Sequence, residues 1–211
     1  MPTSPPHAAE SIGDESTVAE LDELVETARE FGRRGWTPAT SGNYSVRHGE
    51  TIWITRSGLD KRRLTRDGLM PIDRDGQSAD GARPSAETGL HLQLYRRFAG
   101  IHAVLHVHSP MATMLSRRVD APGAIAFEGL ELLKALPGIS SHEARIELPV
   151  VANDQDMTRL AASVEPWLDR APAGYLIAGH GLYAWGARVA DAARHLEALE
   201  FLLQLHWMEQ Q

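Results

Sequence analysis

The sequence contains no cysteine among its 211 residues, so it can form neither a disulfide nor a thiolate metal site. A thiol nucleophile is excluded for the same reason. Any metal that the chain holds must therefore be bound by nitrogen and oxygen atoms. The lack of cysteine is also typical of a reducing compartment, and we expect a cytoplasmic protein.

Long hydrophobic runs and a surplus of basic residues are missing as well. No window approaches the roughly 20 apolar residues that a membrane-spanning helix needs. The net charge is -7, and basic residues occur singly or in short groups such as residues 61–63. We therefore expect neither a membrane nor a nucleic acid as a partner. Residues 1–14 lack the apolar core of a signal peptide and predict a disordered leader.

The rest of the chain, residues 15–211, has the composition of a single globular domain, with 43% hydrophobic and 23% charged residues. Apolar residues at three- and four-residue steps predict a helix from Thr17, with Thr17 and Glu20 as a capping box. Hairpins and helices alternate irregularly after it, which favours an α/β sandwich with a largely antiparallel or mixed sheet. The predicted elements are a hairpin of residues 44–47 and 51–55, a helix capped by Ser85, a strand over 103–108, a helix capped by Ser109, a strand over 148–151, a helix over 154–168, a hairpin of 175–178 and 182–185, and a C-terminal helix over 191–207.

His106 and His108 lie two residues apart in a short apolar segment. In a strand, residues at this spacing share one face, with Cα atoms about 6.5–7 Å apart, so two imidazoles can bind one ion. The alternative is a pair of polar residues on a solvent-facing strand, but the apolar neighbours favour a central strand. His180 lies between two glycines in a tight turn and supplies a third candidate ligand. Three histidines with an open fourth position are typical of a catalytic metal site.

Three polar loops carry glycine or begin a helix, and such loops can present backbone N–H groups and hydroxyls to an anion. Each one, taken alone, also fits a plain turn. Together with a three-histidine set they predict a phosphate pocket. Its candidate residues are Ser41, Gly42, Asn43, Ser57, Gly58 and Ser85.

Three glutamates are candidates for the acid/base group of such a site. Glu87 lies in the first turn of a predicted helix, where the helix dipole alone favours an acidic residue. Glu128 and Glu131 lie in an otherwise apolar stretch. Residue spacing does not choose among the three.

These motifs, taken in order, resemble the class II aldolase family. The resemblance rests on Gly35-Trp36 with residues 38–43, Ser57-Gly58 with Asp60-Lys61, residues 84–88, and His106-x-His108-Ser109. Within that family, residues 153–156 and 179–186 resemble the methylthioribulose-1-phosphate dehydratase branch. The similarity extends from about Phe31 to Leu203.

The resemblance implies a three-layer α/β/α sandwich and a zinc enzyme that acts on a sugar phosphate. His106, His108 and His180 match the metal ligands of the family, with one Zn2+ per subunit. The implied reaction removes water from 5-methylthioribulose 1-phosphate to give 2,3-diketo-5-methylthiopentyl 1-phosphate, a step of methionine salvage. A homo-oligomer, commonly a tetramer, is implied too, with the active site near a subunit interface. Three imidazoles also accept iron, cobalt, nickel or manganese, so the residues alone leave the metal open.

The resemblance leaves the acid/base group open. Glu131 matches the glutamate that serves in the dehydratases, whereas Glu87 matches the carboxylate that serves in the sugar-phosphate aldolases. Glu128 lies three residues before Glu131 and is easily confused with it in an alignment. A true aldolase or 4-epimerase is therefore one alternative, and a non-catalytic adducin-like interaction domain, which would lose the histidines, is another. We expect His206 and Trp207 to be surface residues rather than parts of a neighbour's site.

Overall fold

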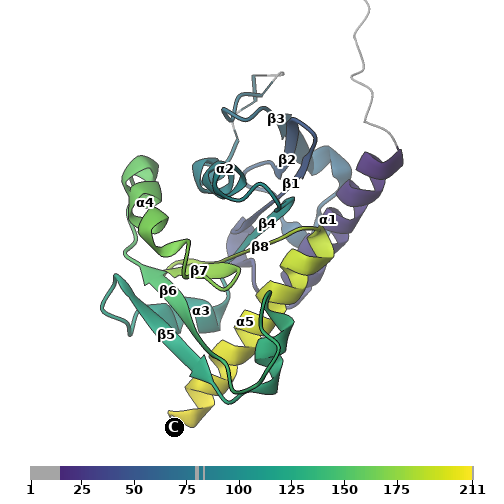
Figure 1. The fold of residues 1–211 in the computed structure, drawn as a ribbon. Coiled ribbons are helices and arrows are strands. Elements are labelled where there is room, and N and C mark those ends of the chain that lie inside the picture. The colour runs from purple at the N-terminus through teal and green to yellow at the C-terminus, as the bar shows by residue number, and fades with distance from the viewer. Residues whose placement is uncertain (1–14, 79–80, 83, 211) are drawn as a thin grey trace, which may run out of the picture.

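The fold is described from a computed structural model for residues 15–78, 81–82 and 84–210 (Figure 1). The predicted leader over residues 1–14 lies outside this part of the chain. One sheet runs through the molecule in the strand order β3-β2-β1-β4-β8-β7-β6-β5. Only the β6–β7 pair is parallel among the described strands, and all other neighbours are antiparallel. The expected largely antiparallel, mixed sheet is confirmed.

The elements agree with most of the sequence prediction. The strands are β1 (Asn43–His48), β2 (Thr51–Thr55), β3 (Leu69–Ile72), β4 (Ala103–Val107), β5 (Gly123–Glu128), β6 (Arg145–Val151), β7 (Gly174–Ile177) and β8 (Gly181–Gly186). The α-helices are α1 (Glu15–Arg33), α2 (Thr88–Arg97), α3 (Pro110–Ser116), α4 (Met157–Val164) and α5 (Val189–Glu209). Short 3-10 helices are η1 (Pro38–Thr40), η2 (Lys61–Arg63), η3 (Arg66–Gly68), η4 (Glu131–Ala135) and η5 (Glu165–Trp167). None of these helices has the length and apolar character to cross a membrane.

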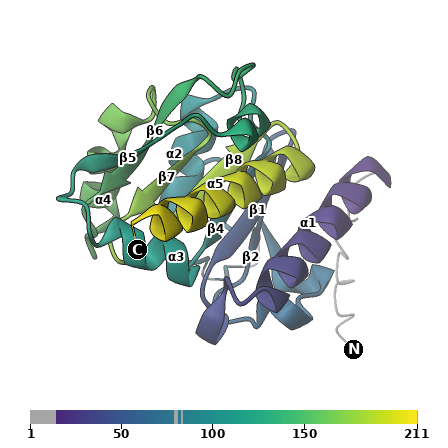
Figure 2. The same cartoon turned by 90° about the horizontal axis from the view of Figure 1, so that it is seen from below.

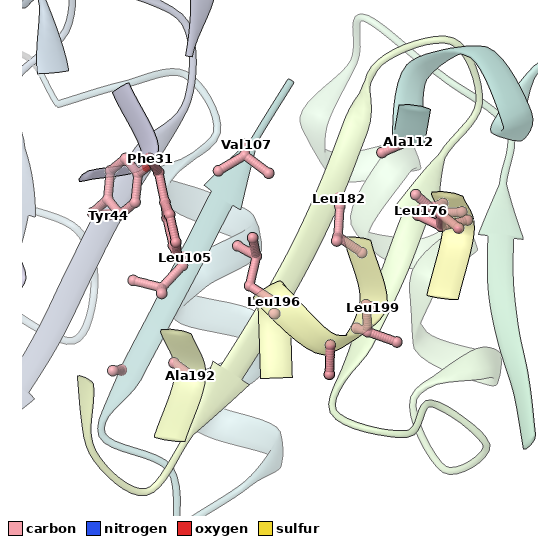
Figure 3. Close-up of a cluster of buried hydrophobic side chains, with 14 of the residues drawn as sticks. Phe31, Tyr44, Leu105, Val107, Ala112, Leu176, Leu182, Ala192, Leu196 and Leu199 are labelled. Atoms are coloured by element: carbon pink, nitrogen blue, oxygen red, sulfur yellow. The ribbon is translucent and has the colours of Figure 1, made fainter. Parts of the chain in front are cut away.

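Helices cover both faces of the sheet. Figure 2 shows α1, α3 and α5 on one face, with α2 and α4 behind the sheet. On the first face, Leu105 and Leu182 pack near Leu196 and Leu199 of α5 (Figure 3). On the second, the alternate residues Val104 and Tyr183 belong to a separate cluster with α2 and α4. The predicted three-layer α/β/α sandwich is therefore confirmed.

Strand β4 is the centre of the sheet, and each of its five residues is buried. Its alternation places Leu105 and Val107 toward α5, and His106 on the opposite face with Val104. A histidine is thereby buried on the α2 side of a rigid central strand. This position decides the geometry of the candidate site.

Two predicted helix starts are wrong. Helix α1 already includes Glu15, so Thr17 is buried inside its first turn rather than at the predicted N-cap position. Helix α2 begins at Thr88, with Glu87 in the N-cap position, so Ser85 is not its cap. Ser85 instead closes the preceding turn, where its carbonyl accepts from Thr88 N at 3.1 Å. That turn points Glu87 into the molecule.

Strands β3 and β5 were not predicted. Both are at the edges of the sheet, where one side has no partner strand. Pro71 lies within β3, and β5 contains Gly123, Ala124 and Ala126, all of which weaken the sequence signal of a strand. Pairing with β2 and β6 overrides these local preferences.

Candidate metal centre and active site

Four side chains from separate parts of the chain converge at one end of β4. Glu87, His106, His108 and His180 each offer one ligand atom, and these atoms all lie within 4.8 Å of one another. The Nε2 atoms of His106 and His108 are 2.9 Å apart. Glu87 Oε1 lies 2.8 Å from His180 Nε2, and Glu87 Oε2 lies 3.5 Å from His106 Nε2. We refer to these four residues as the histidine–glutamate cluster.

The ring of His106 is fixed in both orientation and tautomer. Its Nδ1–H donates to the carbonyl of Leu182 at 3.1 Å, which leaves the lone pair of Nε2 facing the cluster. The ring stacks on Tyr183 with centroids 4.0 Å apart, and Tyr183 stacks in turn on Tyr175 at 5.0 Å. A hydrogen bond to the second nitrogen is the usual way in which proteins orient a metal-binding histidine.

His180 is held by the turn between β7 and β8 and by helix α3. Its carbonyl accepts from Thr113 Oγ1 at 3.0 Å, and the N–H of Gly179 donates to Ser116 Oγ at 3.0 Å. Glycine is required on the other side of His180, because a Cβ at Gly181 would lie 2.1 Å from the carbonyl oxygen of Val107. Residues 106–116 therefore supply two candidate ligands and support the third.

The charge states of His106, His108 and Glu87 suit a metal. Burial lowers the pKa of His106 well below its usual value, and burial, together with His180, lowers the pKa of His108 to about 4. Burial raises the pKa of Glu87, but His106, His180 and the amide of Asn43 lower it more, so the net pKa is below its usual value. Neutral imidazoles and an ionised carboxylate are the forms that bind a divalent cation. The donor set therefore fits a metal ion.

A cavity of about 230 Å³ opens beside the histidine–glutamate cluster, and Glu87 and His108 form part of its wall. Ser41 Oγ is buried there and has no hydrogen-bond partner among the described residues. Gly42 and Gly58 both have φ of +76°, a backbone conformation that residues with a side chain rarely adopt. The structure brings all six predicted phosphate-binding residues to this wall, namely Ser41, Gly42, Asn43, Ser57, Gly58 and Ser85.

Comparison with known proteins identifies the family. Residues 22–207 match the class II aldolase and adducin N-terminal domain. The chain belongs to this family. It is 54% identical to the methylthioribulose-1-phosphate dehydratase of Methylococcus capsulatus, over 87% of this chain and 90% of that protein. It is also 54% identical to the enzyme of the same name from Stenotrophomonas maltophilia, over 90% and 91% of the two chains.

Solved structures of class II aldolase proteins share the fold. L-fuculose-1-phosphate aldolase from Thermus thermophilus is 28% identical and superposes with a TM-score of 0.72, over 91% of this chain and 96% of that one. YgbL from Escherichia coli, described as a putative aldolase/epimerase/decarboxylase, has a TM-score of 0.76 at 24% identity, over 90% and 89% of the two chains. All four members of the histidine–glutamate cluster lie within the segment that matches the family.

Lys61 also borders the cavity, although sequence reasoning did not single it out as a binding residue. Its side chain is 1% exposed, and Nζ donates to the carbonyls of Thr40 at 2.7 Å and Leu59 at 3.0 Å. Burial lowers its pKa to about 8, so the ammonium stays mainly protonated at pH 7. In the sequence Lys61 is one of three adjacent basic residues and has no distinguishing feature. The turn of η2 buries Lys61 and leaves Arg62 and Arg63 exposed.

The other two candidate glutamates lie outside the histidine–glutamate cluster. Glu131 begins η4, its side chain is 71% exposed, and it pairs with Lys134. Glu128 ends β5, and its carboxylate lies 3.2 Å from Arg145 Nη1. Neither borders the cavity. Within one chain, Glu87 is therefore the candidate acid/base group that reaches the site.

The C-terminal candidates make contacts within their own chain. His206 lies edge-on to Phe127, with ring centroids 5.8 Å apart, and its Nε2 is 2.7 Å from Gln210 Nε2. Trp207 lies under the guanidinium of Arg118, 4.2 Å from the ring centroid. Both residues are half-buried, and the expectation that they lie outside any site stays a prediction.

Glu200 of α5 is a buried carboxyl group in contact with Ser109, the residue that follows His108. It is 1% exposed and accepts a hydrogen bond from Ser109 Oγ at 2.5 Å, while its Oε2 has no partner among the described residues. Burial raises its pKa to about 7, and the Ser109 hydroxyl offsets only part of this rise. The same hydroxyl accepts from Ala112 N and caps α3.

Glu200 should make the protein less stable as the pH rises. The unfolded chain releases this proton near pH 4.5 and the folded chain near pH 7, so the folded state binds more protons between these values. The free energy of unfolding should therefore fall by about 3 kcal/mol across this window and stay low above it. Glu200→Gln should remove that fall. Urea unfolding of both proteins at pH 5 and pH 8 measures the difference, and an identical pH dependence would show that Glu200 does not titrate in this way.

Proposed function

We propose that this chain is a methylthioribulose-1-phosphate dehydratase that works in the cytoplasm in methionine salvage. It removes water from 5-methylthioribulose 1-phosphate and forms 2,3-diketo-5-methylthiopentyl 1-phosphate. The observation that carries the proposal is the histidine–glutamate cluster beside a cavity lined by hydroxyls, glycines and a buried lysine. Relatives that bear this enzyme name and are 54% identical over most of the chain support the choice of substrate.

His106, His108 and His180 hold the metal in this proposal, and zinc is the ion that we expect, at one per subunit. A neutral three-imidazole set is the usual arrangement of a catalytic zinc with an open position. When bound, the ion supplies Lewis-acid polarisation of the substrate carbonyl and its neighbouring hydroxyl. Metal analysis of the purified protein tests the identity of the ion, because other divalent metals accept the same ligands.

Glu87 acts as the base for the first proton transfer. Its ionised carboxylate takes the proton from C3 of the ketose, and the C3–H electron pair forms the C3–C4 double bond as the C4 hydroxyl leaves. A proton delivered to that hydroxyl completes one molecule of water. The enol then takes a proton at C4 and loses the proton of its C3 hydroxyl, so that C3 becomes the second carbonyl of the diketone. Positioned acid/base groups typically contribute on the order of 10²- to 10⁴-fold to such steps.

Glu131 is the donor that we propose for the departing hydroxyl, on the resemblance to the dehydratases. Because it is exposed and lies outside the histidine–glutamate cluster of its own chain, it must act from a neighbouring copy. This assignment requires the homo-oligomer that the resemblance implies, for which we expect a tetramer with the site near a subunit interface. Two carboxylates would then divide the base and acid roles.

The phosphate group binds in the cavity through the loop N–H groups and hydroxyls of its wall. Lys61 adds a positive charge there, and among the described residues two of its three N–H donors have carbonyl partners, which leaves the third for the phosphate. A charge-assisted hydrogen bond contributes about 1.5–3 kcal/mol, which corresponds to about 10- to 100-fold in affinity.

Lys61→Met should accordingly raise KM by about 10-fold or more and change kcat much less. Inorganic phosphate should also become a weaker competitive inhibitor. Steady-state kinetics on the variant measure both effects, with Arg63→Met as the control, because Arg63 is an exposed neighbour outside the cavity wall. A KM within about twofold of the parent would rule out Lys61 as a phosphate ligand.

Aldol cleavage is the competing activity, because class II aldolases in the same family act on similar ketose phosphates. The zinc-loaded protein is therefore assayed in parallel with 5-methylthioribulose 1-phosphate and L-fuculose 1-phosphate. The dehydratase proposal predicts diketone absorbance from the first substrate and negligible cleavage of the second. Faster formation of aldehyde and ketone fragments from the second would instead assign an aldolase.

A further inference from the structure

A row of buried polar side chains ends on the carboxylate of Glu87. Asn43 Nδ2 donates to Glu87 Oε2 at 2.5 Å, and Asn43 Oδ1 is hydrogen-bonded to Nε2 of His91. Ser45 Oγ lies 2.7 Å from Nδ1 of His91 and 2.8 Å from the hydroxyl of Tyr95. We refer to Asn43, His91, Ser45 and Tyr95 as the donor chain. None of the four is more than 4% exposed.

The donor chain is built on two rigid elements. Asn43 and Ser45 are two residues apart on β1 and therefore share one face of the strand. His91 and Tyr95 continue from Glu87 at four-residue steps along α2, so all three lie on one side of the helix. Asn43 is also the direct partner of His106 in the β1–β4 register. Strand β1 thus contacts Glu87 through Asn43 and pairs at the same residue with His106.

The direction of every hydrogen bond follows from Glu87. An ionised carboxylate only accepts, so the NH2 group of Asn43 faces it and the amide oxygen faces His91. His91 must then carry its proton on Nε2 and accept at Nδ1 from the Ser45 hydroxyl. Burial lowers the pKa of His91 to about 4, which keeps the ring neutral and makes this tautomer possible.

Tyr95 completes the sequence of donors. Since the Ser45 proton is directed to His91, its oxygen accepts from the Tyr95 hydroxyl at 2.8 Å, and the contact of that hydroxyl with the carbonyl of His102 is longer, at 3.4 Å. All donors therefore point toward Glu87. Oε2 is held by Asn43, and Oε1 is left to face His180.

We propose that the donor chain positions the Glu87 carboxylate in the site and that His91 is its key positioning residue, an inference that rests on the role proposed for Glu87. His91 neither lines the cavity nor belongs to the histidine–glutamate cluster, and it reaches the site only through Asn43. It acts by fixing the amide of Asn43 in the orientation that donates to Glu87. The alternative is that these polar side chains only satisfy one another's hydrogen bonds in the core. In that case the donor chain would not need to end on Glu87, a carboxylate of the site.

The test compares His91→Leu, which removes the donor to Asn43, with His91→Gln, whose amide N–H can replace Nε2–H. We expect His91→Leu to lower both metal affinity and kcat by about 10- to 100-fold at nearly unchanged KM. His91→Gln should stay within about threefold of the parent protein in both quantities. Metal affinity is measured by competition with a chromogenic chelator and needs no substrate, so it tests the inference even if the proposed dehydratase activity is absent.

Two results would overturn the inference. One is a parent-like metal affinity in His91→Leu, and the other is a loss in His91→Gln as large as that in His91→Leu, which would indicate a purely structural residue. If His91→Leu does not fold, Ser45→Ala replaces it, because it deletes only the hydroxyl that fixes the His91 tautomer. A folded Ser45→Ala protein with unchanged metal affinity would then contradict the proposal.

Discussion

Replacement of His180 with alanine should abolish turnover and lower metal affinity by more than about 100-fold. Loss of a residue that only supports a metal ligand typically costs about 10- to 100-fold in affinity. His180 supplies one of three imidazole nitrogens that meet at the cluster, and the cluster holds no fourth imidazole among the described residues. The fold should survive, because the turn is held by its own backbone bonds to α3. Metal content after dialysis against chelator and the rate of diketone formation measure the two effects.

His206→Ala is the matched control for this experiment. His206 is half-buried on α5, and its contacts are with Phe127 and Gln210 rather than with the cluster. We expect this variant to keep its metal and its rate. Retained metal in His180→Ala would contradict the assignment of the three histidines, and loss of activity in His206→Ala would mean that the C-terminal helix contributes to a site.

Glu87→Gln and Glu131→Gln should both lose kcat by about 10²- to 10⁴-fold, but for different reasons. Glu87 is part of the histidine–glutamate cluster, so its replacement should weaken metal binding as well as the proton transfer at C3. Glu131 lies outside the cluster with an exposed side chain, so its replacement should leave metal affinity unchanged. Glu128→Gln is the control, because Glu128 is an exposed glutamate three residues away that pairs with Arg145.

Mixed oligomers test whether Glu131 acts from a neighbouring copy. Subunits with Glu131→Gln keep a complete cluster, and subunits with His180→Ala keep Glu131. Mixing the two inactive proteins under exchange conditions should therefore restore part of the activity, since some sites combine an intact cluster with an intact Glu131. No recovery in verified mixed oligomers would contradict action between subunits, and a fully active Glu131→Gln protein would leave Glu87 as the sole acid/base group.

The convergence of the three histidines could be predicted because each lies where local pattern and backbone geometry agree. His106 and His108 lie at the end of a mainly apolar segment, and this segment is the central strand β4, with all five residues buried. His180 was recognisable from the glycines on both sides, and Gly181 is indeed a position where a side chain would meet the backbone of β4. The largely antiparallel sheet and the two hairpins followed from the same strand and turn signals.

The surroundings of Glu87 were less accessible from the sequence. The helix dipole alone accounts for an acidic residue at the start of a helix, so the position of Glu87 did not by itself indicate a site. Only the tertiary structure shows its carboxylate turned toward His180. The burial of Lys61 depends on the turn of η2 against the loop that contains Thr40. The four-residue steps from Glu87 through His91 to Tyr95 were visible in the sequence. Their meaning required the partner strand, because Asn43 and Ser45 complete the donor chain from a segment more than 40 residues away.

The most direct test of the account is product analysis with metal-depleted protein to which Zn2+ is returned. The protein is incubated with 5-methylthioribulose 1-phosphate, and the product is identified by mass spectrometry. The account predicts a single product that has lost one water, formed only after zinc is restored and absent with the His180→Ala variant. Cleavage of the carbon chain into two products would contradict the proposed reaction. Water loss at the same rate without metal would contradict the role of the metal.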